Sequence, residues 1–371
     1  MIIGVPKEVK NQECRVGLTP HNVKSLTAAG HQVWVQQNAG LGVGFTDHHY
    51  QLAGANIVAF PEEIFENAEL VVKVKEPQKQ EIKLLRPGQI LFTYLHLAPD
   101  VDQTEGLLQS DAIAIAYETV TDVNGRLPLL APMSEVAGRM SIQAAAHHLE
   151  KRQGGLGMLL SGIPGVSPAN LLILGAGVVG SNALQVAVGM GANVTIVDSN
   201  VDRLRALDQI YGNKINTRYS EPASLEELII AADVVIGGVL VPGGSAPKLL
   251  TRQHLEHMKE GSVIVDVAID QGGCFETSRA TTHDDPTYSI HGVVHYCVAN
   301  MPGAVPRTST LGLTNATFPF VMAIAQKGLV NALKENQHLR NGVSVYRQSL
   351  TCKAVAASQN RSYQSIDQLL V

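Results

Sequence analysis

A glycine-rich turn behind an apolar run constrains the fold of this chain more than any other feature. Residues 171–174 are consecutively apolar, as in a buried parallel strand, and Gly175-Ala176-Gly177-Val178-Val179-Gly180 follows directly. In such a turn the first glycine permits a tight bend, the second lets the backbone approach a diphosphate, and the third lets a helix pack closely on the strand. With a helix expected from Val178, the pattern predicts a Rossmann unit that binds a dinucleotide.

An acidic residue at the end of the next apolar run refines the expected ligand. Asp198 closes the run 194–197, 18 residues beyond Gly180, where a carboxylate usually accepts hydrogen bonds from the ribose hydroxyls. A carboxylate there repels a 2′-phosphate, so we expect NAD rather than NADP. The nearby Arg203 and Arg205 leave NADP open as the alternative, because an arginine can accommodate that phosphate.

Strand-like and helix-like segments alternate along most of the chain, which is typical of a parallel sheet covered by helices. In the first third, strands are predicted at 31–36, 70–74, 89–94 and 112–117, and helices at 20–29, 79–85 and 100–109. A second series has strands at 170–174, 193–197, 233–236 and 262–267, and helices at 178–190, 200–211, 224–231 and 251–258. The alternation predicts an α/β fold with two domains, each a doubly wound parallel sheet.

A long helical segment separates the two series. It is expected at 133–153, with Ser134 placed to cap its N-terminus, and an ordered loop or two-strand excursion should follow over 154–165. The last apolar helical run, 314–333, has no evident strand after it, so we expect it to return to the first domain. The predicted domains are a discontinuous substrate and catalytic domain, 1–128 with 305–371, and a Rossmann NAD-binding domain, 129–304.

Composition excludes several classes of function. The formal net charge of −5 over 371 residues offers no basic field for nucleic acid. The most apolar stretch, 170–197, is interrupted by polar residues and glycines, so it fits strand, turn, helix and strand better than a membrane span. The N-terminus lacks the pattern of a signal peptide. We therefore expect a cytoplasmic protein with no membrane partner.

Cysteine and histidine spacing gives no sign of a metal centre. The four cysteines are scattered without a Cys-x-x-Cys pair, and neither adjacent histidine pair, His48-His49 or His147-His148, forms a His-x-x-x-His or similar ligand pattern. Neither disulfides nor a bound metal are expected.

Residues just after predicted strands are the candidates for chemistry, because ligands of open α/β sheets bind beyond the carboxyl ends of the strands. Asp270 follows one such run and precedes a double glycine, whereas Asp266 lies inside the strand and is expected to be structural. His96 and Lys75 follow strands of the first domain. A histidine can exchange a proton at neutral pH, and a lysine or Arg15 could hold a carboxylate. Each residue also has a simpler interpretation: His96 as a structural histidine, and Lys75 and Arg15 as solvated surface charges.

Several longer motifs are spread along the chain: Ile3-Gly4-Val5-Pro6-Lys7-Glu8, Arg15-Val16-Gly17-Leu18-Thr19-Pro20, Val74-Lys75-Glu76-Pro77, Tyr94-Leu95-His96-Leu97-Ala98, Met133-Ser134-Glu135-Val136-Ala137-Gly138-Arg139, Asp270-Gln271-Gly272-Gly273 and Val298-Ala299-Asn300-Met301-Pro302-Gly303. Together they resemble the motifs of the alanine dehydrogenase family over essentially the whole chain.

The resemblance implies reversible, NAD-dependent oxidative deamination of L-alanine to pyruvate and ammonia by a homohexamer with a discontinuous substrate domain. It implies that His96 and Asp270 are catalytic and that Arg15 and Lys75 bind the substrate carboxylate. Besides the turn glycines Gly175, Gly177 and Gly180, the implied cofactor contacts are Ser134, Val178, Val179, Asp198, Arg203, Ser220, Val239, Leu240, Val267, Asp270, Arg279, Val298, Asn300 and Met301.

Three alternatives fit parts of the pattern. The nearest is the soluble NAD(H)-binding component of a proton-translocating transhydrogenase, which is similar in fold and N-terminal motif but needs no amino-acid site. A saccharopine-type dehydrogenase would share the architecture with a bulkier substrate, and a nucleotide-sensing module would lack catalysis. His96 and the lack of a membrane segment argue against the first, and candidates at all four catalytic and substrate positions argue against the last. Substrate breadth, regulation and the physiological direction stay open.

Overall fold

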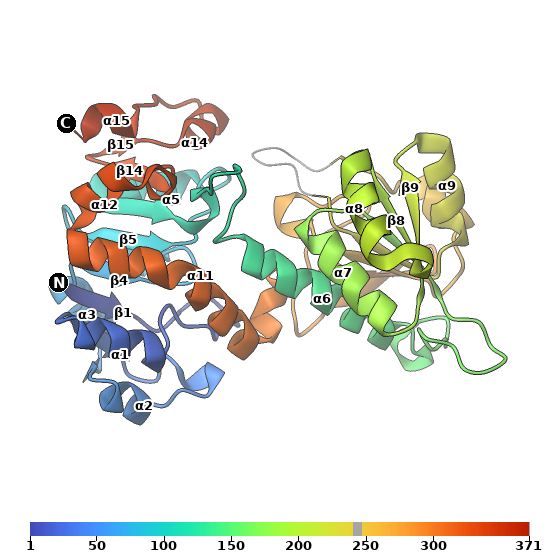
Figure 1. Ribbon diagram of the computed structural model, residues 1–371, viewed down its shortest axis with the longest axis horizontal. Coiled ribbons are helices and arrows are strands. Elements are labelled where there is room, and N and C mark those ends of the chain that lie inside the picture. Colours follow the sequence, from blue (N-terminus) through green and yellow to red (C-terminus); the bar gives the residue numbers. More distant parts are fainter. Residues whose placement is uncertain (240–246, 371) are drawn as a thin grey trace. The chain divides into compact units, whose positions relative to one another are not determined.

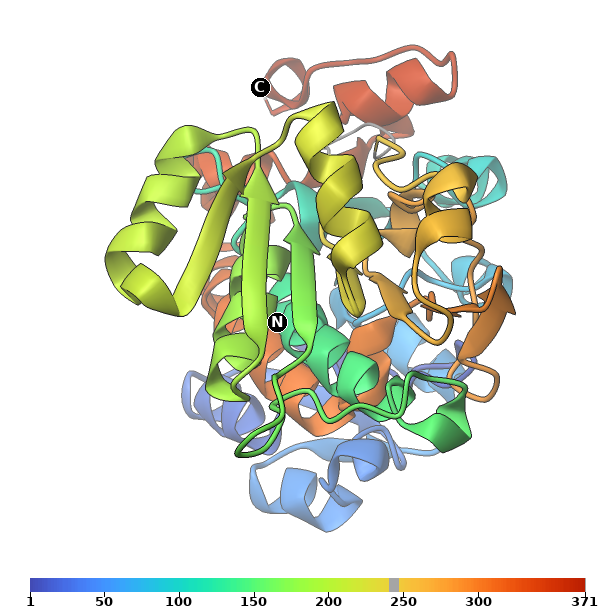
Figure 2. The same ribbon diagram turned by 90° about the vertical axis from the view of Figure 1, so that its right-hand side faces the viewer.

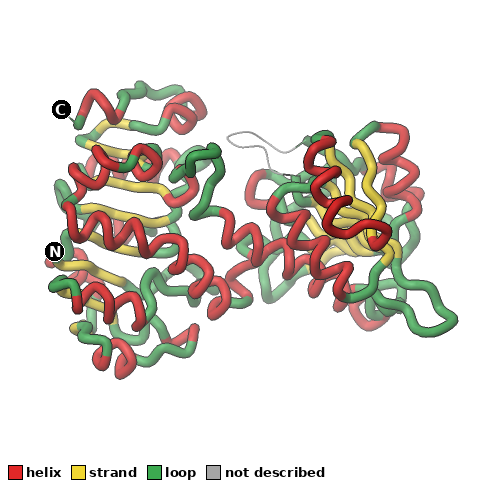
Figure 3. Tube along the Cα trace, viewed as in Figure 1, coloured by secondary structure: helices red, strands yellow, loops and turns green. Residues whose placement is uncertain are grey.

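The computed structural model describes residues 1–239 and 247–370, so Leu240, an expected cofactor contact, lies outside the described residues. The chain forms two compact units. Unit 1 consists of Met1–Met133 with Val305–Val371, and unit 2 is the continuous segment Ser134–Ala304. In each unit, strands form a central sheet with helices around it (Figure 3).

Unit 1 is built on an eight-stranded sheet with the order β15-β14-β6-β5-β4-β1-β2-β3. Strands β1 to β6 run parallel, whereas β14 and β15 are antiparallel additions at the edge beside β6. Because the chain proceeds outward from β1 in one direction and from β4 in the other, the strand order reverses between these two central strands. The strands are β1 (Ile2–Val5), β2 (Gln32–Gln36), β3 (Asn56–Val58), β4 (Leu70–Val72), β5 (Ile90–Thr93), β6 (Ile113–Ala116), β14 (Val343–Tyr346) and β15 (Ser349–Leu350).

Helices from both ends of the chain cover this sheet. Figure 1 shows α1, α11 and α12 in front of the strands of unit 1. Both β4 and β5 are buried throughout, because a parallel strand with helices on both faces must be apolar on both faces. The helices are α1 (Pro20–Ala28), α2 (Asp47–Leu52), α3 (Pro61–Asn67), α4 (Lys79–Ile82), α5 (Val101–Ser110), α11 (Pro306–Lys327), α12 (Leu329–Glu335), α13 (Gln337–Arg340), α14 (Lys353–Ser358) and α15 (Ile366–Leu369).

Unit 2 has a seven-stranded sheet with the order β12-β13-β11-β10-β7-β8-β9, whose strands face the viewer in Figure 2. Only the edge strand β12 is antiparallel. The strands are β7 (Asn170–Leu174), β8 (Asn193–Asp198), β9 (Ile215–Tyr219), β10 (Val234–Gly237), β11 (Val263–Asp266), β12 (Thr287–Ile290) and β13 (Val293–Tyr296). The helices are α6 (Ala131–His148), α7 (Val178–Gly189), α8 (Val201–Tyr211), α9 (Pro222–Ala231) and α10 (Arg252–His257).

The core of unit 2 shows why the run before the glycine turn is continuously apolar. Leu171 and Ile173 belong to one buried cluster, whereas Leu172 and Leu174 belong to another. Successive side chains of a strand point to opposite faces, so β7 has buried apolar side chains on both faces of its sheet. The predicted α/β class with two parallel sheets is confirmed in outline, although antiparallel edge strands make both sheets mixed.

Two local expectations are wrong. Ser134 does not cap the long helix, because α6 begins at Ala131 and contains Ser134 in its first turns. Pro132 is compatible with this earlier start, since an early helical position has no intrahelical partner for an N–H group. The helix also ends at His148, short of the predicted 153, with the 3₁₀ turn Lys151–Gln153 after it.

The C-terminal segment also differs from expectation. The helical run starts at Pro306 and is divided at Gly328, whose φ of +73° ends α11 before α12 begins. Contrary to the prediction, strands do follow it. Strand β14 pairs antiparallel with β6, and β15 pairs with β14. The pairing of β14 joins residues far apart in the chain, Val343 with Ile115, so the sequence near β14 and β15 gives little sign of it.

Candidate functional site

The three predicted site residues of unit 1 follow three neighbouring parallel strands. Arg15 lies in the loop after β1, Lys75 follows β4, and His96 follows β5. The carboxyl ends of parallel strands meet at one edge of a sheet, and the strand order reverses here between β1 and β4. Ligands of open α/β sheets bind at such a point. The structure therefore brings these three residues to the same edge.

Arg15 is buried, with 2% of its surface exposed, so it is not the solvated surface charge that the sequence left as an alternative. Its Nε donates to Glu13 Oε1 at 2.7 Å and its Nη2 to Glu13 Oε2 at 2.5 Å. Burial opposes the charge, but Glu13 outweighs it and raises the pKa of Arg15. A permanently charged guanidinium held by a carboxylate is suited to bind a second carboxylate in fixed geometry.

A buried charge network, which sequence reasoning missed, lies beside Lys75. The Lys73 Nζ donates to Glu8 at 3.1 Å and to Glu81 at 2.7 Å, and the Val74 N–H donates to Glu8 at 2.7 Å. Burial lowers the pKa of Lys73, but the two carboxylates outweigh it and raise that pKa. The network anchors the chain just after β4. In the sequence, only the charged residues next to apolar runs indicate this charge network.

His96 lies on a constrained piece of backbone. Its φ of +50° is in the left-handed region, and its ring stacks on Tyr94 with centroids 5.8 Å apart and planes 8° from parallel. Tyr94 is buried, its hydroxyl donates to the Leu129 carbonyl at 2.6 Å, and burial raises its pKa, so it is a neutral phenol at physiological pH. The histidine side chain itself is exposed. This combination suits a proton-transfer group that needs access to a ligand.

The glycine turn of unit 2 follows β7, next to the point where the strand order reverses between β7 and β10. Gly175 has φ +97°, and a Cβ on Gly180 would lie 1.7 Å from the Gly175 carbonyl oxygen. The protein itself therefore requires the first and third glycines. A Cβ on Gly177 would meet no atom within 4 Å, and no described side chain caps α7 at this end. The second glycine thus leaves open space beside an uncapped helix N-terminus, which fits a diphosphate.

Asp198 connects the end of β8 to the glycine turn. Its Oδ2 accepts from the Ala176 N–H at 2.6 Å, and its Oδ1 accepts from the Asn200 N–H at 2.7 Å. A carboxylate has about four acceptor positions, so these bonds leave capacity for ribose hydroxyls. Arg205 pairs with Asp202 at 2.7 Å, whereas Arg203 lies exposed on α8.

Most other expected cofactor contacts lie beyond the carboxyl ends of the strands of this sheet. Ser220 follows β9, Val239 follows β10, Val267 follows β11, and Val298, Asn300 and Met301 follow β13. Val298 and Met301 are buried. Two others come from elsewhere in the unit: Ser134 lies in α6, and Arg279 stacks its guanidinium 4.2 Å from the Tyr288 ring centroid.

Asp270 is exposed in the 3₁₀ turn Ile269–Gln271 after β11, and Asp266 is buried at the end of that strand. Asp266 accepts from the N–H groups of Ala268, Cys274 and Phe275 and from the Ser278 hydroxyl, at 3.1, 2.9, 3.2 and 2.5 Å. The structural role expected of Asp266 is confirmed. It holds both ends of the loop that carries Asp270, and its burial raises its pKa.

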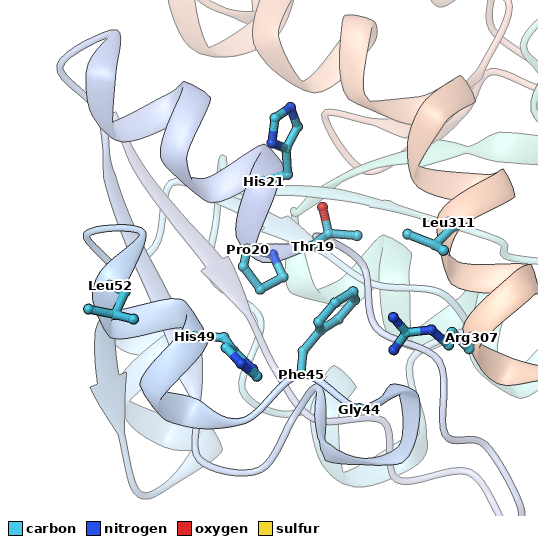
Figure 4. Close-up of a pocket in the computed structure, with 9 residues that line it drawn as sticks. All are labelled: Thr19, Pro20, His21, Gly44, Phe45, His49, Leu52, Arg307 and Leu311. Carbon is cyan, nitrogen blue, oxygen red and sulfur yellow. The ribbon is translucent and has the colours of Figure 1, made fainter.

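Unit 1 has pockets on its surface. One of about 440 Å³ lies near the starts of α1 and α11, where Phe45, His49 and Arg307 are among its lining residues (Figure 4). It contains none of the predicted site residues. A second pocket of about 240 Å³ is lined in part by Glu8, Glu13 and Arg15, so it reaches the β1 side of the candidate edge.

The described residues contain no group of three or more histidine, cysteine, aspartate or glutamate side chains arranged to hold a metal ion. All four cysteines are free thiols. Over the same part of the chain, none of the helices combines the length and the apolar character needed to traverse a bilayer.

Family models and known proteins match this chain over nearly its whole length. The family model "Alanine dehydrogenase/PNT, N-terminal domain" matches residues 4–137, and "Alanine dehydrogenase/PNT, C-terminal domain" matches residues 141–353. The alanine dehydrogenase of Halomonas elongata is 55% identical over 363 residues, which cover 98% of each chain.

Solved structures also resemble this chain over nearly its whole length. One named L-alanine dehydrogenase superposes with a TM-score of 0.94 at 50% identity, over 97% of this chain and 99% of the other. A transhydrogenase from Sinorhizobium meliloti superposes with a TM-score of 0.82 at 24% identity, over 94% of this chain and 100% of the other. The latter similarity concerns the fold alone.

Proposed function

The chain belongs to the alanine dehydrogenase/PNT family, and we propose that it catalyses the reversible, NAD-dependent oxidative deamination of L-alanine to pyruvate and ammonia. The observation that carries the proposal is the arrangement of Arg15, Lys75 and His96 along one strand-end edge, in a chain whose full-length relatives are named alanine dehydrogenases. In this proposal, unit 1 binds the amino acid and unit 2 binds the cofactor.

In this proposal the substrate carboxylate is bound by two cations. Arg15 is held rigid by Glu13, and the backbone of Lys75 is held by the Thr93 hydroxyl, which donates to the Lys75 carbonyl at 2.8 Å. Bound between these two positive charges, alanine presents its Cα–H bond in a defined orientation before reaction. Such orientation is a large part of enzymatic rate enhancement.

The proton transfers are assigned to His96 and Asp270. When bound, NAD⁺ supplies the acceptor for the hydride that leaves Cα. The amino acid then becomes an iminium ion, to which water adds as His96 or Asp270 accepts a proton. The carbinolamine collapses to pyruvate and ammonia as His96 moves the proton from the hydroxyl oxygen to the leaving nitrogen. An exposed imidazole on a fixed backbone suits both steps.

NAD is the proposed cofactor, with its diphosphate at the Gly175–Gly180 turn and its adenosine ribose on Asp198. The open space at Gly177 and the uncapped start of α7 support the first contact. The partly buried carboxylate at the end of β8 supports the second and disfavours a 2′-phosphate.

We propose that the working form is a cytoplasmic homohexamer, as the family resemblance implies. Four free thiols are compatible with a reducing compartment. Light scattering on the purified protein should give about six times the 39.6 kDa chain mass.

The test of the function is NADH oxidation with pyruvate plus ammonium, with each omitted in turn. Both substrates should be required, and L-alanine with NAD⁺ should drive the reverse reaction. A protein that binds NADH yet gives no turnover with both substrates would overturn the proposal and favour the transhydrogenase component or a nucleotide sensor.

A further inference from the structure

The loop after β5 carries a carboxylate contact that the proposed reaction has not used. Glu118 lies in the 3₁₀ turn Tyr117–Thr119 that follows β6, the strand next to β5. Its Oε1 accepts from the His96 N–H at 2.7 Å, and both of its oxygens accept from the Leu95 N–H at 3.2 Å. Consecutive N–H groups in a turn form a concave site for an anion, and here the anion is this side chain.

The hydrogen bond from the His96 N–H to Glu118 lies where the backbone of His96 has an unusual conformation. A non-glycine residue at φ +50° is held in a sparsely populated conformation, which persists where the surroundings enforce it. Glu118 does so at the N–H groups, while Gln103 donates to the Leu95 carbonyl at 3.0 Å and Gln359 to the Leu97 carbonyl at 2.7 Å. These glutamine hydrogen bonds go to Leu95 and Leu97, whereas Glu118 accepts directly from the His96 N–H.

We propose that Glu118 is a positioning residue that fixes the His96 imidazole against Tyr94 in the orientation required for proton transfer, an inference that rests on the proposed function. The left-handed turn and the hydrogen bond at its N–H direct the exposed ring onto the Tyr94 ring, parallel to within 8°. In this role Glu118 acts through the backbone of Leu95 and His96.

Two substitutions separate positioning from folding. Glu118→Ala removes every acceptor, whereas Glu118→Gln keeps one acceptor oxygen and the side-chain length. We expect Glu118→Ala to lower kcat for L-alanine oxidation about 10- to 100-fold, as misplacement of a reacting group does, with KM for alanine changed less than about threefold. Glu118→Gln should recover most of the loss. The matched control is Glu66→Ala, which removes an exposed carboxylate of α3 and should behave as the parent.

A double variant tests whether the effect passes through His96. In a His96→Ala background, adding Glu118→Ala should lower the residual rate less than about threefold, because no imidazole is left to position. Equal losses in both backgrounds, or a Glu118→Ala enzyme within twofold of the parent, would overturn the proposal.

Amide hydrogen exchange tests the anchoring without any turnover. A peptide spanning residues 94–98 should exchange faster in Glu118→Ala than in the parent, while Glu66→Ala leaves it unchanged. Unchanged exchange in Glu118→Ala would refute the anchoring even if the rate fell. Conversely, a parent inactive with alanine refutes the proposed function, whereas the exchange result still decides whether Glu118 holds His96.

Discussion

Single carboxylates that accept backbone N–H groups recur beside the candidate reactive residues. Glu118 holds the N–H groups of Leu95 and His96, Asp266 holds the ends of the Asp270 loop, and Asp198 holds the N–H of Ala176. Hydrogen bonds to an ionised acceptor are stronger than neutral ones. Each therefore fixes a loop where a reacting or binding group must keep its position.

Asp198 is the residue that should decide between the two cofactors. Replacing it by Asn keeps an acceptor for the Ala176 N–H but removes the charge that opposes a 2′-phosphate. We expect the ratio of kcat/KM for NAD⁺ to that for NADP⁺ to fall on the order of 10-fold, because one hydrogen bond to a charged group contributes a free energy of about that size. Asp202→Asn, on the exposed start of α8, is the control. An unchanged ratio in Asp198→Asn would contradict the ribose assignment.

His295 should make the stability of the fold depend on pH. It is fully buried in β13, and the hydrogen-bond pattern fits a neutral ring: Nδ1 donates to the Val293 carbonyl at 2.9 Å, and Nε2 accepts from the Thr277 hydroxyl at 2.8 Å. Burial lowers its pKa from 6.5 to about 4. The unfolded chain therefore takes up a proton first as the pH falls.

It follows that the contribution of His295 to the free energy of unfolding is complete above pH 6.5 and is lost between about pH 6.5 and 4. The full loss is about 3 kcal/mol. Urea unfolding at pH 7 and 4.5 measures it. His295→Gln should flatten the difference between the two pH values, whereas the exposed His257→Gln should leave it as in the parent. A parent-like difference in His295→Gln would refute the assignment.

At the scale of one element, the glycines of the turn have different roles. We expect Gly180 to be required by the fold and Gly177 by the ligand. A methyl group at Gly180 would collide with the Gly175 carbonyl, so Gly180→Ala should lower the free energy of unfolding by about 1–3 kcal/mol or more. At Gly177 the methyl meets only open space. Gly177→Ala should therefore keep the melting temperature within about 2 °C of the parent and weaken NADH binding.

Calorimetry and NADH fluorescence titration measure the two effects independently. If Gly177→Ala bound NADH as tightly as the parent, the diphosphate would not approach the backbone at that glycine.

The sequence predicted those elements whose signal is local. The strand before the glycine turn is apolar at every position because both of its faces are buried, and the turn itself has its glycines at fixed spacing. Strands β14 and β15 were not predicted, and neither were β1, β3, β9, β12 and β13, because a short strand carries little local signal unless it lies in a longer apolar run, as β4 does. Helix α6 starts at Ala131 because Pro132 fits an early helical position.

The contacts that hold the candidate groups join residues far apart in the chain and have no local signature. Glu118 reaches His96 from 22 positions away, and Lys73 reaches Glu8 from 65. The sequence therefore predicted which residues follow strand ends, but not what fixes them in place.

On the scale of the whole molecule, unit 2 is one continuous segment inserted between the two segments of unit 1. Its sheet has its own apolar clusters on both faces, as an independently folding domain needs. We therefore expect residues 131–304, a fragment that keeps α6 whole, to unfold cooperatively on heating and to bind NADH. It should not oxidise alanine, because Arg15, Lys75 and His96 are absent.

Circular dichroism and NADH fluorescence test these outcomes on the purified fragment. The same fragment with Gly177→Ala should melt like its parent and bind NADH more weakly, so that loss of binding is not mistaken for loss of folding. A fragment without a cooperative transition would show that unit 2 depends on unit 1 for its fold. A folded fragment that fails to bind NADH would instead show that the strand-end edge of unit 2 is not sufficient for the cofactor.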